Sequence, residues 1–155
     1  MRTNLPQLPF LLISLLAAIT GAYAQGVPPE VMNRIRSEIE RSYPDDYSMQ
    51  KILIDNQVES YRFLQTYRPS DIPDDLFRRV STQIKGEYSD DYSMQKILLQ
   101  NQVESYRFLR GYDPGGVPRD VVERLRAKVS SEYPEDFSMQ KILLEHQIQS
   151  YRDLH

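Results

Sequence analysis

The chain of 155 residues contains no cysteine and no tryptophan, and only two histidines. Without cysteine it can form no disulfide framework and has no site for a cysteine-linked lipid. The histidines, His146 and His155, both lie near the C-terminus. No His-Glu-x-x-His motif, Cys/His cluster or Ser/His/Asp arrangement can be built from this inventory. We therefore expect no enzyme activity, no metal and no cofactor.

Clustered charge of one sign is also missing. The chain has 19 Lys and Arg against 22 Asp and Glu, a net charge of -3 at pH 7, and the opposite charges are interspersed. Nucleic acids and anionic membranes attract clustered Lys and Arg. We expect neither as the main partner.

The one long hydrophobic run lies at the start of the chain. It extends from Leu8 to Ala24, 17 residues, which is shorter than the roughly 20 that a membrane-spanning helix needs. Arg2 precedes the run, and Ala22-Tyr23-Ala24 matches a signal-peptidase site. These features predict a secreted protein, periplasmic or extracellular, and retention as a membrane anchor is the alternative. The predicted division is a signal peptide, 1–24, and a helical repeat domain, 25–155.

The remainder of the chain repeats itself three times at a spacing of 45 residues. The clearest copies are YPDDYSMQKILIDNQVESYRFL, YSDDYSMQKILLQNQVESYRFL and YPEDFSMQKILLEHQIQSYRDL, which begin at Tyr43, Tyr88 and Tyr133. A fixed period of this length is typical of small units that bury their apolar faces against one another. The predicted repeats are 26–70, 71–115 and 116–155.

The sequence of each repeat predicts two helices. The first is predicted to begin at a proline (Pro28, Pro73, Pro118), and the second after an aspartate that caps it (Asp46, Asp91, Asp136). The acidic pairs that contain these caps offer an alternative reading as a metal site, which capping makes unnecessary. The sequence therefore predicts an all-α fold of three tandem helical hairpins, stacked as a short solenoid or six-helix array.

The two helices of a repeat differ in how much apolar surface they carry. In the first, Val31, Met32, Ile35, Ile39 and Tyr43 fall within about 120° of the helix projection. In the second, apolar side chains cover roughly 240°, including Met49, Ile52 and Tyr61. We expect the second helix to contact both its own partner and the next repeat.

The last repeat differs at one informative position. Asp153 stands where the other repeats have Phe63 and Phe108. A polar residue is expected on an outward surface that no further repeat covers. This pattern predicts that position 63 lies between repeats.

The phrase YPDDYSMQKIL followed by QVESYRFL resembles a short helical module of uncharacterised bacterial exported proteins. The resemblance covers about half of each repeat. It implies a bacterial origin and no particular activity.

Polar side chains within the apolar arc of the second helix also require partners. Gln50, Gln57, Ser60 and their copies are expected to bond to the loop of a neighbouring repeat, because an unpaired buried amide costs about 1–3 kcal/mol. Contacts to a bound peptide are the alternative.

A row of cations on the exposed strip of the second helix gives the candidate binding residues. They are Lys51, Arg62, Lys96, Arg107, Lys141 and Arg152. An acid four residues after the lysine is missing in the second repeat, so unpaired cations would be open to an acidic partner, with plain solvation as the alternative. We expect an interaction module that binds another protein or an envelope component. The alternative is a polysaccharide-binding protein that uses Tyr61, Tyr106 and Tyr151.

Overall fold

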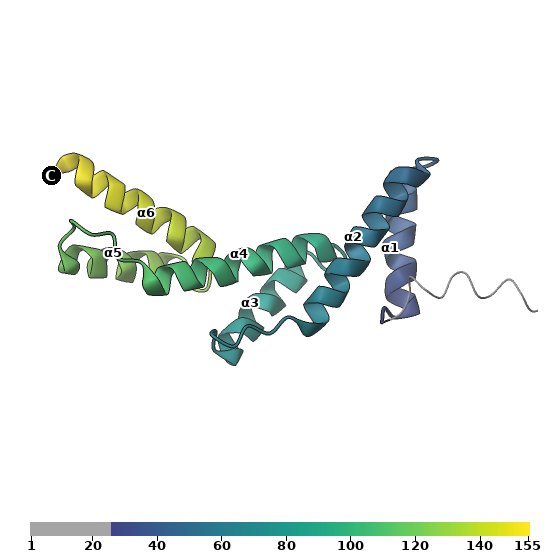
Figure 1. Ribbon diagram of the computed structural model, residues 1–155, viewed down its shortest axis with the longest axis horizontal. Helices are drawn as coiled ribbons and strands as arrows, with labels where there is room; N and C mark the ends of the chain where they lie inside the picture. The colour runs from purple at the N-terminus through teal and green to yellow at the C-terminus, as the bar shows by residue number, and fades with distance from the viewer. Residues whose placement is uncertain (1–25) are drawn as a thin grey trace, which may run out of the picture.

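The computed structural model describes residues 26–155, so the predicted signal peptide lies outside the described residues. These residues form six helices and no strand. The helices are α1 (Pro29–Ser42), α2 (Tyr47–Thr66), α3 (Asp74–Glu87), α4 (Tyr92–Gly111), α5 (Arg119–Glu132) and α6 (Phe137–Leu154). The predicted all-α fold of three hairpins is confirmed. Figure 1 shows the hairpins side by side in an extended row, with α1 and α2 at one end and α5 and α6 at the other.

The caps of the second helices are the predicted ones. The carboxylates of Asp46, Asp91 and Asp136 accept hydrogen bonds from the backbone N–H groups three residues later, at 3.0 to 3.1 Å. The prolines lie one residue earlier than expected, at the N-cap of the first helices. Their fixed φ suits either place, because neither requires the missing N–H.

The second helices form the continuous layer of the array. The backbone of α4 approaches both α2 and α6 closely, whereas the backbones of α1, α3 and α5 each approach only the second helix of their own hairpin among the described elements. Tyr92 of the second repeat is buried in the core of the first, with Val31, Ile35 and Val58. The prediction that the second helix contacts the next repeat is therefore confirmed.

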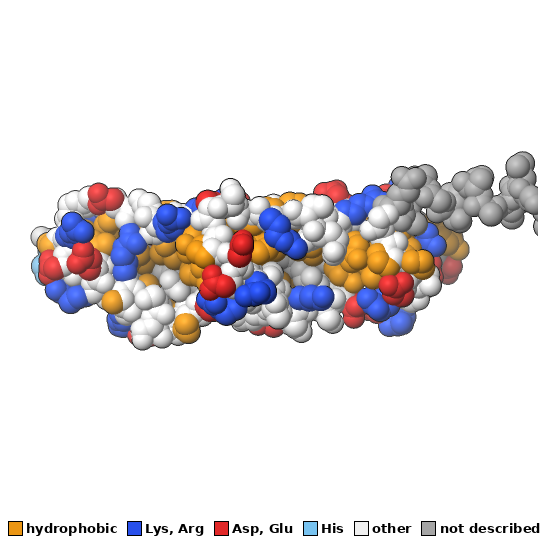
Figure 2. Space-filling model, turned by 90° about the horizontal axis from the view of Figure 1, so that it is seen from below, with side chains coloured by type: hydrophobic (Ala, Val, Ile, Leu, Met, Phe, Trp, Pro, Cys, Tyr) orange, Lys and Arg blue, Asp and Glu red, His pale blue; other side chains and the backbone are white. Residues whose placement is uncertain are grey.

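Some residues counted in the apolar arcs are exposed. Ile52, Ile97 and Ile142 have exposed fractions of 56%, 52% and 59%, and Tyr43 lies at the end of α1 with 40% exposed. The expectation that the arc of the second helix is covered around its whole width is wrong on this side, because none of the six described helices packs against these isoleucines. Figure 2 shows, on one face of the array, hydrophobic side chains along its length between charged ones.

Among residues 26–155, no helix combines the length and apolar character that a membrane span needs.

Candidate functional site

The contact between two repeats, which we call a junction, is built around one glutamine. Gln57 Nε2 donates to Oδ1 of Asp91 (2.9 Å), and Gln57 Oε1 accepts from the backbone N–H of Tyr92 (2.8 Å). Gln102 makes the same bonds to Asp136 (2.9 Å) and Phe137 (2.7 Å). A side chain of one repeat thus completes the N-terminal cap of the next repeat's second helix, where backbone N–H groups lack helical partners. The predicted bond to a neighbouring repeat is confirmed for this glutamine.

The other predicted glutamine has a different partner. Gln50 donates to the carbonyl of Tyr43 (2.7 Å), and Gln95 and Gln140 repeat the bond with Tyr88 and Tyr133. These carbonyls belong to the same repeat. The expectation of a neighbouring repeat is wrong for this position, because the side chain turns back to the loop between the two helices of its hairpin.

Aromatic rings fill the junctions. Tyr61 meets Tyr92 edge to face with ring centroids 5.1 Å apart, and Tyr106 meets Phe137 at the same distance. Two of the three tyrosines proposed for polysaccharide binding are therefore half-buried junction residues. Such edge-to-face pairs add about 0.5–1.5 kcal/mol beyond the burial of their area.

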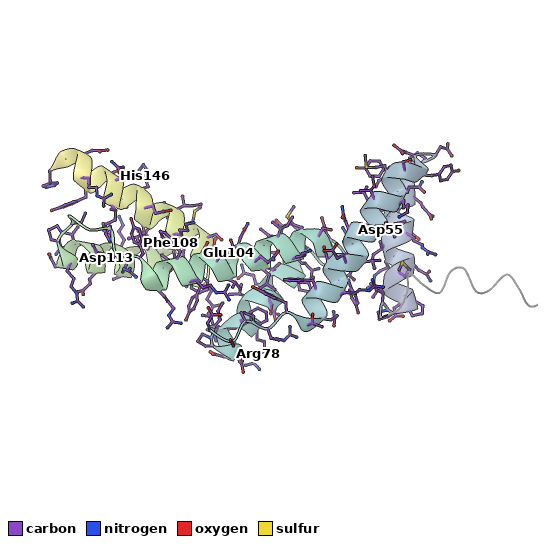
Figure 3. All side chains as sticks on the ribbon, viewed as in Figure 1. Asp55, Arg78, Glu104, Phe108, Asp113 and His146 are labelled. Carbon is purple, nitrogen blue, oxygen red and sulfur yellow. The ribbon has the colours of Figure 1, made fainter. Side chains whose placement is uncertain are left out.

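The two phenylalanines at the positions equivalent to Asp153 also lie at the junctions. The ammonium of Lys96 lies 5.2 Å from the ring centre of Phe63, and that of Lys141 lies 4.7 Å from the ring centre of Phe108. Figure 3 shows Phe108 on α4, beside α6. Position 63 thus lies between repeats as predicted, but its neighbour across the junction is a lysine rather than an apolar core.

The six candidate cations are mostly engaged within the chain. Lys51 pairs with Asp55 (2.6 Å), Lys96 with Glu59 of the previous repeat (2.9 Å), and Arg107 with Asp71 (2.6 Å). Arg152 donates to the carbonyls of Pro114 and Gly115, Lys141 lies over Phe108, and Arg62 also has a partner. The expectation of unpaired cations is wrong, because cations without an acid four residues later, such as Lys96 and Arg107, have partners in neighbouring repeats or loops that spacing along one helix does not reveal. Their role in binding stays a prediction.

One of these pairs changes the acidity of a carboxyl group. Arg107 donates through two nitrogens to the two carboxylate oxygens of Asp71, at 2.6 and 2.7 Å. These bonds lower the pKa of Asp71 from 3.8 to about 2, because they favour the ionised form. The pair attaches α4 to the loop that precedes α3.

The exposed side of the second helices carries the same apolar residues in every repeat. We call this surface the Met–Ile face; it consists of Met49, Ile52, Met94, Ile97, Met139 and Ile142, all exposed. The six-residue stretch SMQKIL that contains them is identical in all three repeats, while the position three residues after the isoleucine varies as Asp55, Gln100 and Glu145. Packing in the core cannot account for the identity of side chains that lie outside it.

Sequence reasoning missed the Met–Ile face because it treated all apolar positions of the helix as buried. The signal was nevertheless present. Helices α2, α4 and α6 need apolar side chains only where they contact another helix. The apolar arc of each is wider than these contacts require, so part of it had to lie on the outside of the array.

A groove of about 880 Å³ lies at the first junction. Its lining includes Tyr61, Phe77 and Tyr92 as well as four cations, Arg34, Arg68, Arg78 and Lys85. Figure 3 shows Arg78 on α3 near its N-terminal end. Aromatic rings beside cations would suit a ligand that combines flat apolar surfaces with negative charge.

Within residues 26–155, no group of three or more His, Cys, Asp or Glu side chains is arranged to hold a metal ion. No protein-family model, curated protein or solved structure matches the chain. The resemblance to a module of bacterial exported proteins therefore stays a prediction.

Proposed function

We propose that this chain is an exported helical-repeat module that binds another protein through the Met–Ile face. The observation that carries the proposal is the identity of exposed Met and Ile side chains in three repeats. Exposed apolar surface that is not needed for folding is typical of protein interaction sites, and Met adapts its shape to a partner.

The arrangement of the face favours a partner that presents apolar side chains several times. Three equivalent patches on a row of connected hairpins can be occupied together, so that each contact raises the effective concentration for the next. Lys51 lies within the same stretch of sequence as Met49 and Ile52, and with its copies it would add charge at the rim of each patch.

The proposal is tested by capture of partners from the native cell envelope with a triple variant, Ile52→Asp, Ile97→Asp and Ile142→Asp. A matched control places the same three charges one turn away, at exposed positions that are not identical in all three repeats: Asn56→Asp, Asn101→Asp and His146→Asp. We expect the partner bound by the wild-type protein and the control to be lost from the triple variant, and single substitutions to give intermediate losses. Unchanged capture by a folded triple variant would refute the proposal.

A second candidate function rests on the groove at the first junction. The presence of Tyr61 beside Arg34, Arg78 and Lys85 favours an acidic polysaccharide as its ligand. Arg78→Glu with Lys85→Glu should then abolish binding to acidic glycans, while Arg119→Glu on α5, which is exposed and distant from the groove lining, should not. Equal binding by both variants would exclude the groove.

A further inference from the structure

We propose that copies of this chain associate head to tail, with the end of one array docking on the start of the next. The partner is a second copy, because the two ends carry the residues that join the repeats within the chain. This inference uses the ends of the array and is independent of the Met–Ile face.

The first repeat presents an acceptor surface that no other repeat within residues 26–155 covers, formed by Asp45, Asp46, Tyr47 and Ile54. Tyr47 is 74% exposed, whereas Tyr92, its equivalent in the second repeat, is 7% exposed in the core of the preceding hairpin. The backbone N–H groups of Tyr47 and Ser48 have no acceptor within residues 26–155, whereas those of Tyr92 and Ser93 bond to Gln57. A groove of about 560 Å³, lined in part by Tyr47, Ile54 and Val58, lies on this surface.

The last repeat presents the matching donor surface, formed by Arg124, Gln147, Tyr151 and Leu154. Gln147 is equivalent to Gln57 and Gln102, and its amide makes no hydrogen bond within the described residues. Tyr151 is equivalent to Tyr61 but stacks on His155, with ring centroids 4.3 Å apart, instead of on a following ring. Leu154 is 80% exposed, although Leu64 and Leu109 at the same position pack against the cores.

The two surfaces match contact by contact when the internal junction is taken as the template. Gln147 would bond to Asp46 and to the N–H of Tyr47, as Gln57 does to Asp91 and Tyr92. Tyr151 would meet the ring of Tyr47, as Tyr61 meets Tyr92.

An ion pair at each internal junction predicts one further contact between copies. Arg34 pairs with Asp90 (3.2 Å) across the first junction and Arg79 with Glu135 (2.5 Å) across the second. Arg124 would pair with Asp45 in the same way. Arg124 already bonds to Asp120 (2.5 Å), but Arg79 bonds to Asp75 and Glu135 together, so the local bond leaves room for the second.

Asp153 does not prevent this docking. At both internal junctions a lysine lies over the ring that Asp153 replaces. In a head-to-tail contact that lysine is Lys51, so a carboxylate would face an ammonium group. The exchange of a ring for a carboxylate makes the contact between copies more dependent on charge, and therefore on salt, than the internal junctions.

The test is sedimentation velocity on protein produced from the full-length sequence, over a wide range of concentration. The wild-type protein should form a concentration-dependent series of oligomers that shrinks at high salt. Tyr47→Ala blocks the acceptor surface, and Gln147→Ala with Tyr151→Ala blocks the donor surface. Each blocked variant should associate at least about tenfold more weakly, the loss expected for an anchor residue of an interface. His146→Ala, an exposed neighbour of Gln147, and Tyr43→Ala should associate like the wild type.

Mixing decides whether the contact has two different sides. Each blocked variant keeps one working surface, so an equal mixture of the two should form a dimer and nothing larger, which also shows that both variants are folded. A wild-type protein that stays monomeric at all concentrations would overturn the proposal. So would a mixture that stays monomeric, or blocked variants that form the full oligomer series.

Discussion

The two junctions between repeats share their glutamine bonds and ring pairs but differ in the side chain beside them. At the first junction the carbonyls of Leu64 and Tyr67, at the end of α2, accept from Arg68 in the adjoining loop. At the second, the equivalent carbonyls of Leu109 and Tyr112 accept from Arg126 on α5. The same carbonyls are therefore satisfied by a guanidinium group from two different places.

This exchange leaves the two junctions with different surfaces. The position of Arg126 is held by Ser81 in the second repeat, and the position of Arg68 is held by Asp113 at the second junction. A small serine leaves the groove at the first junction open, whereas Arg126 extends from α5 to the end of α4 at the second. The requirement to satisfy the end of the helix is common to both junctions, and the arginine that meets it comes from a different element at each.

The largest effect is expected from the ring at the first junction. Tyr92→Ala should lower the free energy of unfolding by about 3–5 kcal/mol, the range for truncation of a large core aromatic side chain. Tyr47→Ala removes the same side chain where it is exposed, and at low protein concentration it should change the free energy by less than about 0.5 kcal/mol. Denaturant unfolding of the two variants measures both values. Equal losses would mean that the repeats do not share a core.

The next effect concerns the glutamines. Gln57→Ala and Gln102→Ala should each cost about 1–3 kcal/mol, because backbone N–H groups and a carboxylate lose their partner in a half-buried place. The costs should be similar, since the bonds have the same geometry at both junctions. Gln147→Ala is the matched control in the last repeat. In thermal melts of the dilute monomer, its melting temperature should equal that of the wild-type protein. A clear difference between Gln57→Ala and Gln102→Ala would show that the junctions differ in more than their arginines.

The arginine exchange gives a rescue experiment. Arg126→Ser should destabilise the protein by about 1–2 kcal/mol, because two carbonyls of α4 lose a charged donor. Adding Asp113→Arg recreates the arrangement of the first junction and should recover most of that loss. Chemical denaturation of the single and double variants measures the recovery. If Asp113→Arg has the same effect with and without Arg126, the two arginines do not act on the same carbonyls.

The smallest effect is the pH dependence that comes from the pair of Asp71 and Arg107 in the middle repeat. Asp71 has glycine at the equivalent position in the other repeats, Gly26 and Gly116. Its pKa is lowered to about 2 in the folded protein, so its contribution is present above the ordinary pKa of 3.8 and is lost as the pH falls from about 4 to 2. The Asp71 carboxyl carbon, followed by NMR, should titrate near pH 2 and return toward its ordinary value in Arg107→Ala. Titration near pH 4 in the wild-type protein would exclude the ion pair in solution.

Local features of the fold could be predicted from the sequence because they depend on neighbours in the chain. The caps Asp46, Asp91 and Asp136 and the hairpins follow from residue type and period. The partners of Lys96, Arg107 and Arg126 could not be predicted, because these residues bond to groups 14 to 37 positions away in the chain. The Met–Ile face could not be predicted either, because its prediction requires knowing which side of the second helix the other helices leave uncovered.

The central claim is that the repeats are stable only through their junctions. It is tested most directly by the thermal unfolding of a peptide that spans the first repeat, 26–70, followed by circular dichroism. Alone, this repeat loses Tyr92 from its core and every partner of Gln57. We expect little helix and no cooperative transition, in contrast to one cooperative transition for the whole chain. A cooperative melt of the single repeat would contradict the claim and would show that the three hairpins are independent units.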